Sequence, residues 1–234
     1  MAIADLLATA NREKRTVLTE VESKELIREA GIPVVETRLA RSEKEAIRLA
    51  KLLGFPVVLK IVSPNVIHKS DIGGVKVGLT GERQVAQAYN QIMHGVSNVN
   101  PSATIHGVSV QPMALQGIEV IIGMYKDSQF GPLLMFGLGG IMVEVLKDVA
   151  FRLVPLTRRD ARNMIREIKA YPLLDGYRGR DPADTAALEV ALLSLSEFIE
   201  KHPSIKEVDL NPILAYKEGL LAVDARVILE EDQG

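Results

Sequence analysis

Apolar and polar residues follow one another along the chain in patterns typical of both helices and strands. Helical periodicity after a capping residue, as at Ser42 with Glu45, predicts amphipathic helices. β-branched segments that alternate or run together, often introduced by proline, predict strands. The expected helices cover residues 20–30, 43–53, 81–96, 157–169 and 184–201. The expected strands cover residues 31–40, 55–62, 75–79, 104–113, 118–125, 132–140, 143–156, 205–216 and 220–229.

The order of these elements favours an α+β fold. Helices and strands mix in the first half, whereas the second half has hairpins followed by two helices and a last hairpin that turns at Gly219. Clustered strands and helices are typical of α+β lobes rather than of one doubly wound parallel sheet. We therefore expect two lobes, formed by residues 1–107 and 108–234.

Composition excludes several classes of protein. The chain has 234 residues, a formal net charge of -2 and no cysteine. Disulfides, thiolate metal sites and a thiol nucleophile are therefore excluded, and a basic surface for nucleic acid or anionic membrane is not expected. Without a signal-peptide pattern or a long apolar segment, we expect a cytoplasmic protein.

Standard nucleotide-binding motifs are missing from the sequence. There is no P-loop pattern, and the segment GLGGIM (137–142) lacks the last glycine of the dinucleotide fingerprint. Its glycines suit either a tight turn at a strand end or a close backbone approach to a phosphate.

Lys60 is a charged residue in an otherwise apolar strand, FPVVLKIV (55–62). A lysine within a buried strand needs an anionic partner or an opening into a cleft. The alternative is a position on an edge strand, where lysine discourages the addition of further strands.

His68 lies in a loop bounded by proline and glycine, SPNVIHKSDIGG (63–74). Reactive residues concentrate on loops that a scaffold positions, and a neutral imidazole can act as a nucleophile near neutral pH. A lone loop histidine is also common as an ordinary surface residue.

Asp209, Asn211 and Asp224 form a third group of polar residues. Alternation along the strand places the first two on one face, and the hairpin through Gly219 brings Asp224 alongside them. Oxygen ligands of this kind suit Mg²⁺. Turn residues at a strand end would give the same pattern.

Several segments together resemble one family. They are GFPVVLKIVSPNVIHKSDIGGVKVGL (54–79), VQPM (110–113), the segment from IEVIIG to FRLVPL (118–156) and EVDLNP (207–212). From about residue 16 to residue 230 the chain resembles the ATP-grasp β subunit of the ADP-forming (NDP-forming) acetyl-CoA and acyl-CoA synthetases. This resemblance implies an ATP-grasp fold, in which two lobes hold ATP between them.

The resemblance also implies a reaction, in which acyl-CoA, ADP and phosphate exchange with acid, CoA and ATP through a phosphohistidine. His68 is then the phosphorylated histidine, and Asp209 orients or stabilises it. The other implied contacts are Lys60 with the nucleotide phosphates, the hinge Gln111, Pro112 and Met113 with adenine, Glu119 with the ribose, and Asn211 and Asp224 with Mg²⁺.

A separate α subunit follows from the same resemblance. The chain has no room for the CoA-binding and ligase domains that the full reaction needs, so CoA is expected to bind mainly to an α subunit in an α2β2 heterotetramer, typical of archaeal energy metabolism. Two alternatives remain open. One is another ATP-grasp ligase with an acyl-phosphate intermediate, and the other is a non-catalytic nucleotide-sensing subunit.

Overall fold

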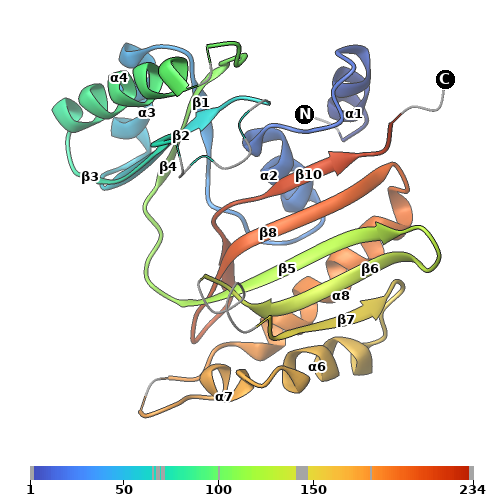
Figure 1. Ribbon diagram of the computed structural model, residues 1–234. Coiled ribbons are helices and arrows are strands. Elements are labelled where there is room, and N and C mark those ends of the chain that lie inside the picture. Colours follow the sequence, from blue (N-terminus) through green and yellow to red (C-terminus); the bar gives the residue numbers. More distant parts are fainter. Residues whose placement is uncertain are drawn as a thin grey trace. The chain divides into compact units, whose positions relative to one another are not determined.

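The computed structural model of the protein describes residues 3–64, 66, 69, 72–99, 101–140, 147–179 and 181–231 (Figure 1). The chain divides into two compact units. The four-stranded unit contains Thr19–Val21 and Val35–Leu115, and the six-stranded unit contains the chain up to Leu18, Glu22–Val34 and the chain from Gln116. The chain thus passes from one unit to the other four times.

The four-stranded unit is an antiparallel sheet with two helices packed on it. The sheet has the order β1-β4-β2-β3. Its elements are β1 (Arg38–Ala40), α3 (Glu43–Leu53), β2 (Val57–Val62), β3 (Val75–Leu79), α4 (Glu82–Val99) and β4 (Gly107–Pro112). Leu59 and Ile61 of β2 belong to the same core as Leu49 of α3 and Ile92 of α4. The alternate residues of β2, including Lys60, therefore point to the sheet face opposite the helices.

The six-stranded unit is an antiparallel sheet of order β10-β8-β5-β6-β7, with β9 paired to β8. Its strands are β5 (Ile118–Asp127), β6 (Gly131–Leu138), β7 (Val149–Leu153), β8 (Ile205–Ala215), β9 (Leu220–Ala222) and β10 (Arg226–Leu229). The helices are α1 (Ile3–Arg12), α2 (Glu20–Glu29), whose first two residues belong to the four-stranded unit, α6 (Arg158–Glu167), α7 (Tyr171–Leu174) and α8 (Thr185–Lys201). Its core joins Phe136 and Leu210 of the sheet to Ile165 and Leu192 of the helices.

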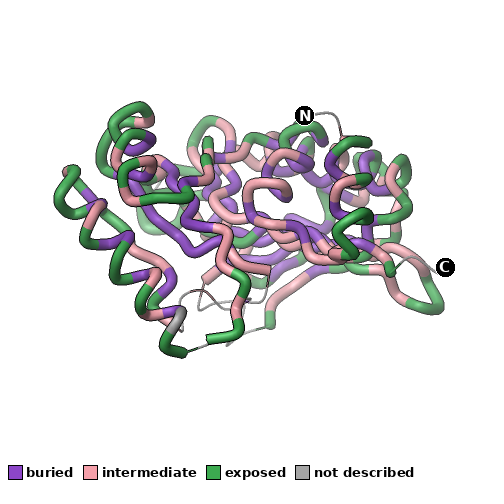
Figure 2. The backbone as a smooth tube through the Cα atoms, turned by 90° about the horizontal axis from the view of Figure 1, so that it is seen from above, coloured by how far each residue is buried: buried purple, intermediate pink, exposed green. Residues whose placement is uncertain are grey.

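Buried residues run along the strands and along one side of the helices, and exposed residues concentrate at turns and on the outer sides of the helices (Figure 2). This distribution is what the apolar periodicity requires, because a two-residue or 3.6-residue repeat gives each element one apolar face. No helix among the described residues is long and apolar enough to cross a membrane.

Several sequence predictions are confirmed by the helix ends and turns. Ser42 caps α3, with its side chain accepting from the Glu45 backbone N–H at 3.2 Å. Thr157 and Asp160 form a reciprocal capping box at α6, and Asp184 caps α8. Gly54 follows α3 with a φ of 85°, a value that favours glycine. The prediction of an α+β fold built from antiparallel strands is confirmed as well.

Other boundaries differ from the prediction. The segment 31–40 is a strand only at Arg38–Ala40, with a single parallel bridge between Val34 and Ala222. Its chain passes from one unit to the other after Val34, so neither sheet pairs its full length. Helix α1 was not expected from the sequence, although Leu6 and Ala10 bury one face of it. The predicted strand 143–156 is observed as Val149–Leu153, and residues 143–146 lie outside the described residues.

The units also differ from a single cut between residues 107 and 108. β4 lies wholly in the four-stranded unit, and the chain passes to the other unit between Leu115 and Gln116. Most of the first 34 residues belong with the C-terminal part of the chain. They do so because α1 and α2 contribute Leu6, Leu26 and Ile27 to the core of the six-stranded unit.

Candidate functional site

Lys60 is a buried cation on an inner strand. β2 pairs with β3 on one side and β4 on the other, so the edge-strand explanation for this lysine is wrong. Its side chain is 7% exposed, and its Nζ donates to Oε1 of Glu20 at 2.8 Å. The expectation that an anionic group meets Lys60 is therefore confirmed.

Glu20 is the residue that sequence reasoning missed. It is the first residue of α2, its side chain is 1% exposed, and its second oxygen accepts from Nζ of Lys69 at 2.8 Å. A carboxylate held by two ammonium groups is stabilised in its charged form by both. The one signal for such a residue is that a buried Lys60 requires an anionic partner, and no local pattern identifies a partner 40 positions away in the chain.

The face of β2 that carries Lys60 is unusually polar for a buried surface. Register places Ser109 opposite Lys60 and Gln111 opposite Val58 on the adjacent strand β4. The Ser109 and Gln111 side chains are both buried, and Oε1 of Gln111 accepts from the Thr37 hydroxyl at 3.3 Å. The four-stranded sheet therefore has an apolar face against its helices and a second face lined by buried polar groups.

The phosphohistidine candidate His68 lies outside the described residues. The chain directly after it is described at Lys69, whose carbonyl accepts from the Gly74 N–H at 2.8 Å. The Gly74 carbonyl in turn accepts from the Ile61 N–H of β2 at 2.8 Å. A Cβ on Gly74 would lie 2.8 Å from the Lys69 carbonyl oxygen, so only glycine fits this close backbone approach.

Gln111, Pro112 and Met113 lie where β4 leads out of the four-stranded unit. The Met113 N–H donates to the Pro56 carbonyl at 2.9 Å, and its side chain is 48% exposed. Since the chain passes to the other unit after Leu115, this segment directly precedes the connection between units. An exposed apolar side chain there suits contact with a flat aromatic ligand.

Glu119 lies on β5 against the glycines at the end of β6. Its carbonyl accepts from the Gly139 N–H at 2.8 Å. A Cβ on Gly140, whose φ is +64°, would lie 2.7 Å from Oε2 of Glu119. The described glycines of this run therefore make a strand end that packs closely on Glu119, as the turn interpretation expects.

Asp209 and Asp224 come together as the hairpin predicts. Gly219, with a φ of 75°, lies in the turn, and Asp209 on β8 is opposite Arg226 on β10. Burial raises the pKa of Asp209 above its ordinary value, Arg226 opposes that shift, and the negative charges of Glu207 and Asp224 add to it. Asp224 is therefore close enough to Asp209 for its charge to act on the Asp209 carboxyl group.

Asn211 occupies an irregular position on β8. Val120 of β5 is opposite Ile213 and Ile122 is opposite Leu210, so two β8 residues, Asn211 and Pro212, face one β5 residue. This β-bulge interrupts the ladder after Leu210, while the alternation of buried and more exposed residues still holds from Val208 to Asn211. The Asn211 side chain is exposed.

The oxygen donors of Asn211 and Asp224 fit Mg²⁺ chemically. This ion commonly takes one or two protein ligands and completes its shell with water and substrate phosphates. Among the described residues no group of three or more His, Asp or Glu side chains is arranged to hold a metal. A magnesium ion here would therefore depend on the nucleotide for much of its coordination.

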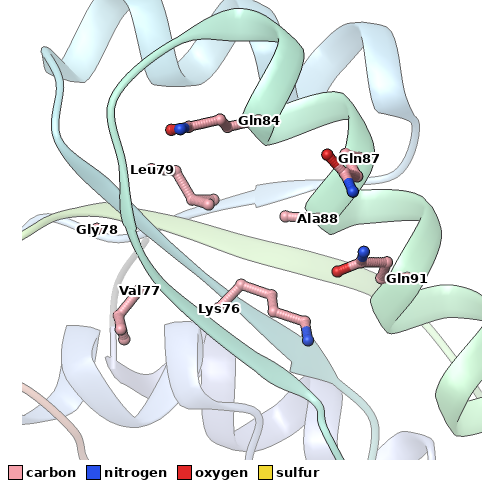
Figure 3. Close-up of a pocket in the computed structure, with 8 residues that line it drawn as sticks. All are labelled: Lys76, Val77, Gly78, Leu79, Gln84, Gln87, Ala88 and Gln91. Atoms are coloured by element: carbon pink, nitrogen blue, oxygen red, sulfur yellow. The ribbon is translucent and has the colours of Figure 1, made fainter.

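A separate cavity of about 270 Å³ lies between β3 and α4 (Figure 3). Figure 3 shows Gln84, Gln87 and Gln91 on the helix and Lys76 on the strand around it. None of the candidate residues lines this cavity, and Lys76 is the one charged side chain among the described residues that do. The cavity is therefore separate from the candidate site.

Comparison with known proteins identifies the relatives of this chain. A family model described as an ATP-grasp domain matches residues 9–229. The β subunit of acetate–CoA ligase (ADP-forming) I from Pyrococcus furiosus is 48% identical, with 96% of this chain and 97% of the relative covered. Acetate–CoA ligase (ADP-forming) I from Archaeoglobus fulgidus is also 48% identical, but the match covers 86% of this chain and only 29% of that protein.

Solved structures agree with these relatives. Acetyl-coenzyme A synthetase 1 of Candidatus Korarchaeum cryptofilum, solved with coenzyme A and Ca-AMPCP, superimposes with a TM-score of 0.95 and 49% identity. The match covers 98% of this chain and all of that one. Another structure of that synthetase superimposes with a TM-score of 0.86 and 46% identity, and the match covers 98% of this chain and all of that one. It holds coenzyme A and Mg-AMPPCP, and its phosphohistidine segment points towards the nucleotide-binding site.

Proposed function

We propose a function from the premise that this chain belongs to the ATP-grasp family and, within it, to the β subunits of ADP-forming acetate–CoA ligases. In this proposal the chain transfers phosphoryl groups between His68 and ADP. The overall reaction is acyl-CoA + ADP + phosphate = acid + CoA + ATP. The match over 97% of a named β subunit, at 48% identity, is the observation that carries this proposal.

The chemistry of the step is simple. The bond between phosphorus and the His68 nitrogen breaks while a β-phosphate oxygen of ADP forms the new bond to phosphorus, and the imidazole leaves as a neutral base after taking up a proton. Such transfers need positioning and charge neutralisation more than covalent assistance from the protein. Lys60 supplies a fixed positive charge for the nucleotide phosphates, and Asp209 orients the imidazole of His68.

Asn211 and Asp224 hold Mg²⁺ in this proposal. The ion, when bound, neutralises charge on the nucleotide phosphates. The hairpin supports this assignment, because it places Asp224 close enough to Asp209 for its negative charge to raise the pKa of Asp209. The related synthetase from Korarchaeum contains Mg-AMPPCP in one of its structures.

The two units act as the lobes of an ATP-grasp site in this proposal. In this proposal the four-stranded unit carries the phosphohistidine loop and the adenine hinge, and the six-stranded unit carries Glu119 and the magnesium ligands. Gln111 to Met113 contact adenine, mainly through their backbone, and Glu119 contacts the ribose. The position of Met113 just before the connection between the units supports this role.

A partner subunit completes the enzyme. The match spans only 29% of the A. fulgidus ligase but 97% of the P. furiosus β subunit, so the single-chain relative has a large further part outside the region of similarity. We assign CoA binding and the acyl-phosphate chemistry mainly to an α subunit in an α2β2 heterotetramer. His68 then carries phosphate between the two sites.

Labelling with γ-³²P-ATP and Mg²⁺ tests the proposal on this chain co-purified with its partner. Acid-labile, base-stable label is expected on the wild type and lost in His68→Ala. His94→Ala is the matched control, because His94 is exposed on α4, and it should retain the label. Label that persists in His68→Ala would favour an acyl-phosphate ligase. Nucleotide binding without any label, even with acetyl phosphate supplied, would favour a sensing subunit.

A further inference from the structure

Glu20 has no role in the function proposed above, yet it contacts Lys60, which does, and Lys69, which directly follows His68. Both of its carboxylate oxygens are engaged, one by Lys60 and the other by Lys69, each at 2.8 Å. We propose that Glu20 is a positioning residue that fixes the phosphate-binding Lys60 and the residue directly after the phosphohistidine relative to each other. This inference rests on the proposed function of His68.

The burial of the cluster makes its geometry specific. The Glu20 side chain is 1% exposed, that of Lys60 is 7% exposed and that of Lys69 is 20% exposed. Water therefore has little access to replace the carboxylate as a partner for either ammonium group. A charged group with so little solvent adopts the position of its counterion, because an unpaired buried charge is strongly disfavoured.

The bond to Lys60 directs its ammonium group. A lysine ammonium is a compact charge on a flexible side chain, and Glu20 accepts a hydrogen bond from it at 2.8 Å. Lys60 extends from an inner strand, so its Cα is fixed by ladder hydrogen bonds on both sides. Glu20 fixes the other end of the side chain. The charge that meets a nucleotide phosphate is thereby held in one place before the nucleotide binds, which is the preorganisation that electrostatic catalysis requires.

The bond to Lys69 acts on the histidine through the chain. Lys69 directly follows His68, and successive Cα atoms are separated by about 3.8 Å. Its main chain is bound to Gly74, which is bound to β2, and its side chain is bound to Glu20. Lys69 is thus held at two points, and under this inference that hold positions the neighbouring His68 for phosphoryl transfer. In the Korarchaeum synthetase the phosphohistidine segment is described both in a site I orientation and pointing towards the nucleotide-binding site.

Single-turnover phosphorylation of His68 from γ-³²P-ATP and Mg²⁺, in the co-purified complex, tests the inference. Glu20→Gln keeps the shape of the side chain and removes its charge. We expect its rate constant to fall by tenfold or more, because misplacement of a reacting group by about 1 Å costs on the order of 10²-fold. We expect the Kd of ADP, measured by calorimetry, to change less than about threefold, since misplacement affects the transfer step more than binding. Glu20→Asp, which restores the charge on a shorter side chain, should recover part of the rate.

Glu22→Gln is the matched control. Glu22 lies on the same helix and pairs with Arg15 at 2.9 Å, so the variant removes an ion pair from α2 without touching either lysine. Its phosphorylation rate should stay within about twofold of the wild type. Thermal unfolding of each variant separates a loss of fold from a loss of position.

Lys69→Met gives a second route to the same answer. It should also slow phosphorylation, and the double variant Glu20→Gln/Lys69→Met should be less impaired than the product of the two single losses, as expected of residues that act together. Wild-type rates in Glu20→Gln, or losses that multiply in the double variant, would overturn the inference. Absence of label on wild-type His68 would instead refute the proposed function itself.

Discussion

The buried Lys60–Glu20–Lys69 cluster predicts an order of stabilities that can be measured without any substrate. Removing one partner of a buried ion pair costs about 3–5 kcal/mol, because the other charge remains in a poorly solvated place. Glu20→Gln withdraws the shared carboxylate from both lysines at once. We therefore expect the full cost of about 3–5 kcal/mol for this variant.

Lys60→Met should cost less. Glu20 keeps its 2.8 Å bond to Lys69 in this variant, so the carboxylate does not lose all its counterions. Methionine also has nearly the volume of lysine and no charge to bury, and swaps that conserve volume are tolerated best. Subtracting these effects leaves an expected loss of about 1–3 kcal/mol.

Denaturant unfolding and thermal melting without nucleotide give the comparison. For a chain of this size 1 kcal/mol corresponds to about 2–4 °C in Tm, so Lys60→Met should melt about 2–12 °C below the wild type and Glu20→Gln lower still. Because the three residues belong to the four-stranded unit, the loss should appear in that unit's transition if the two units melt separately. Equal stability of the two variants, or a greater loss in Lys60→Met, would refute the idea that Glu20 serves both lysines.

Three further predictions concern other parts of the candidate site. Asp209→Asn should lower the rate of His68 phosphorylation by about 100-fold or more, yet it should stabilise the fold at pH 7. Burial raises the pKa of Asp209 in the folded state. The stability of the wild type is therefore highest below the unfolded pKa of about 4, and it falls as the pH rises through the folded pKa. Unfolding titrations at pH 4 and pH 7 should therefore show the gain of the variant only at the higher pH, and the same gain at both would contradict this account. Gly74→Ala should destabilise the protein by about 1–3 kcal/mol, because the new Cβ would lie 2.8 Å from the Lys69 carbonyl oxygen. In the same melting assay, Gly95→Ala in α4 should stabilise the protein by about 0.5–1 kcal/mol, because its Cβ would lie at an ordinary 3.7 Å from the Ile72 carbonyl oxygen. Met113→Ala should weaken ADP binding several-fold in calorimetry while changing unfolding by less than about 0.5 kcal/mol, since its side chain is 48% exposed, and unchanged ADP affinity would remove Met113 from the adenine contact.

Local patterns in the sequence were sufficient for much of the secondary structure. The caps at Ser42, Thr157 and Asp184 were predictable because a capping side chain and the N–H groups it accepts from are at most three residues apart. The hairpin at Gly219 was predictable for the same reason, and it led correctly to the proximity of Asp209 and Asp224. Such features depend on neighbours in the chain.

Features that depend on distant residues were not predictable. The segment 31–40 has strand composition, yet it pairs over only three residues because it links two units. The partner of Lys60 comes from 40 residues earlier, and the charge of Lys60 requires a partner without saying which. The bulge at Asn211 likewise arises from the register of β8 against β5, which no pattern within β8 encodes.

The way the chain divides between its units has a consequence for synthesis on the ribosome. The Thr16 carbonyl accepts from the Leu229 N–H at 2.7 Å, and Leu18 donates to the Val227 carbonyl at 3.1 Å, so the six-stranded unit joins the two ends of the chain. It cannot close until Leu229 has been translated. The four-stranded unit needs nothing beyond Leu115 and can fold while the rest is still being made. The nascent protein would thus assemble its lysine–glutamate cluster well before the strand that carries Asp209 exists.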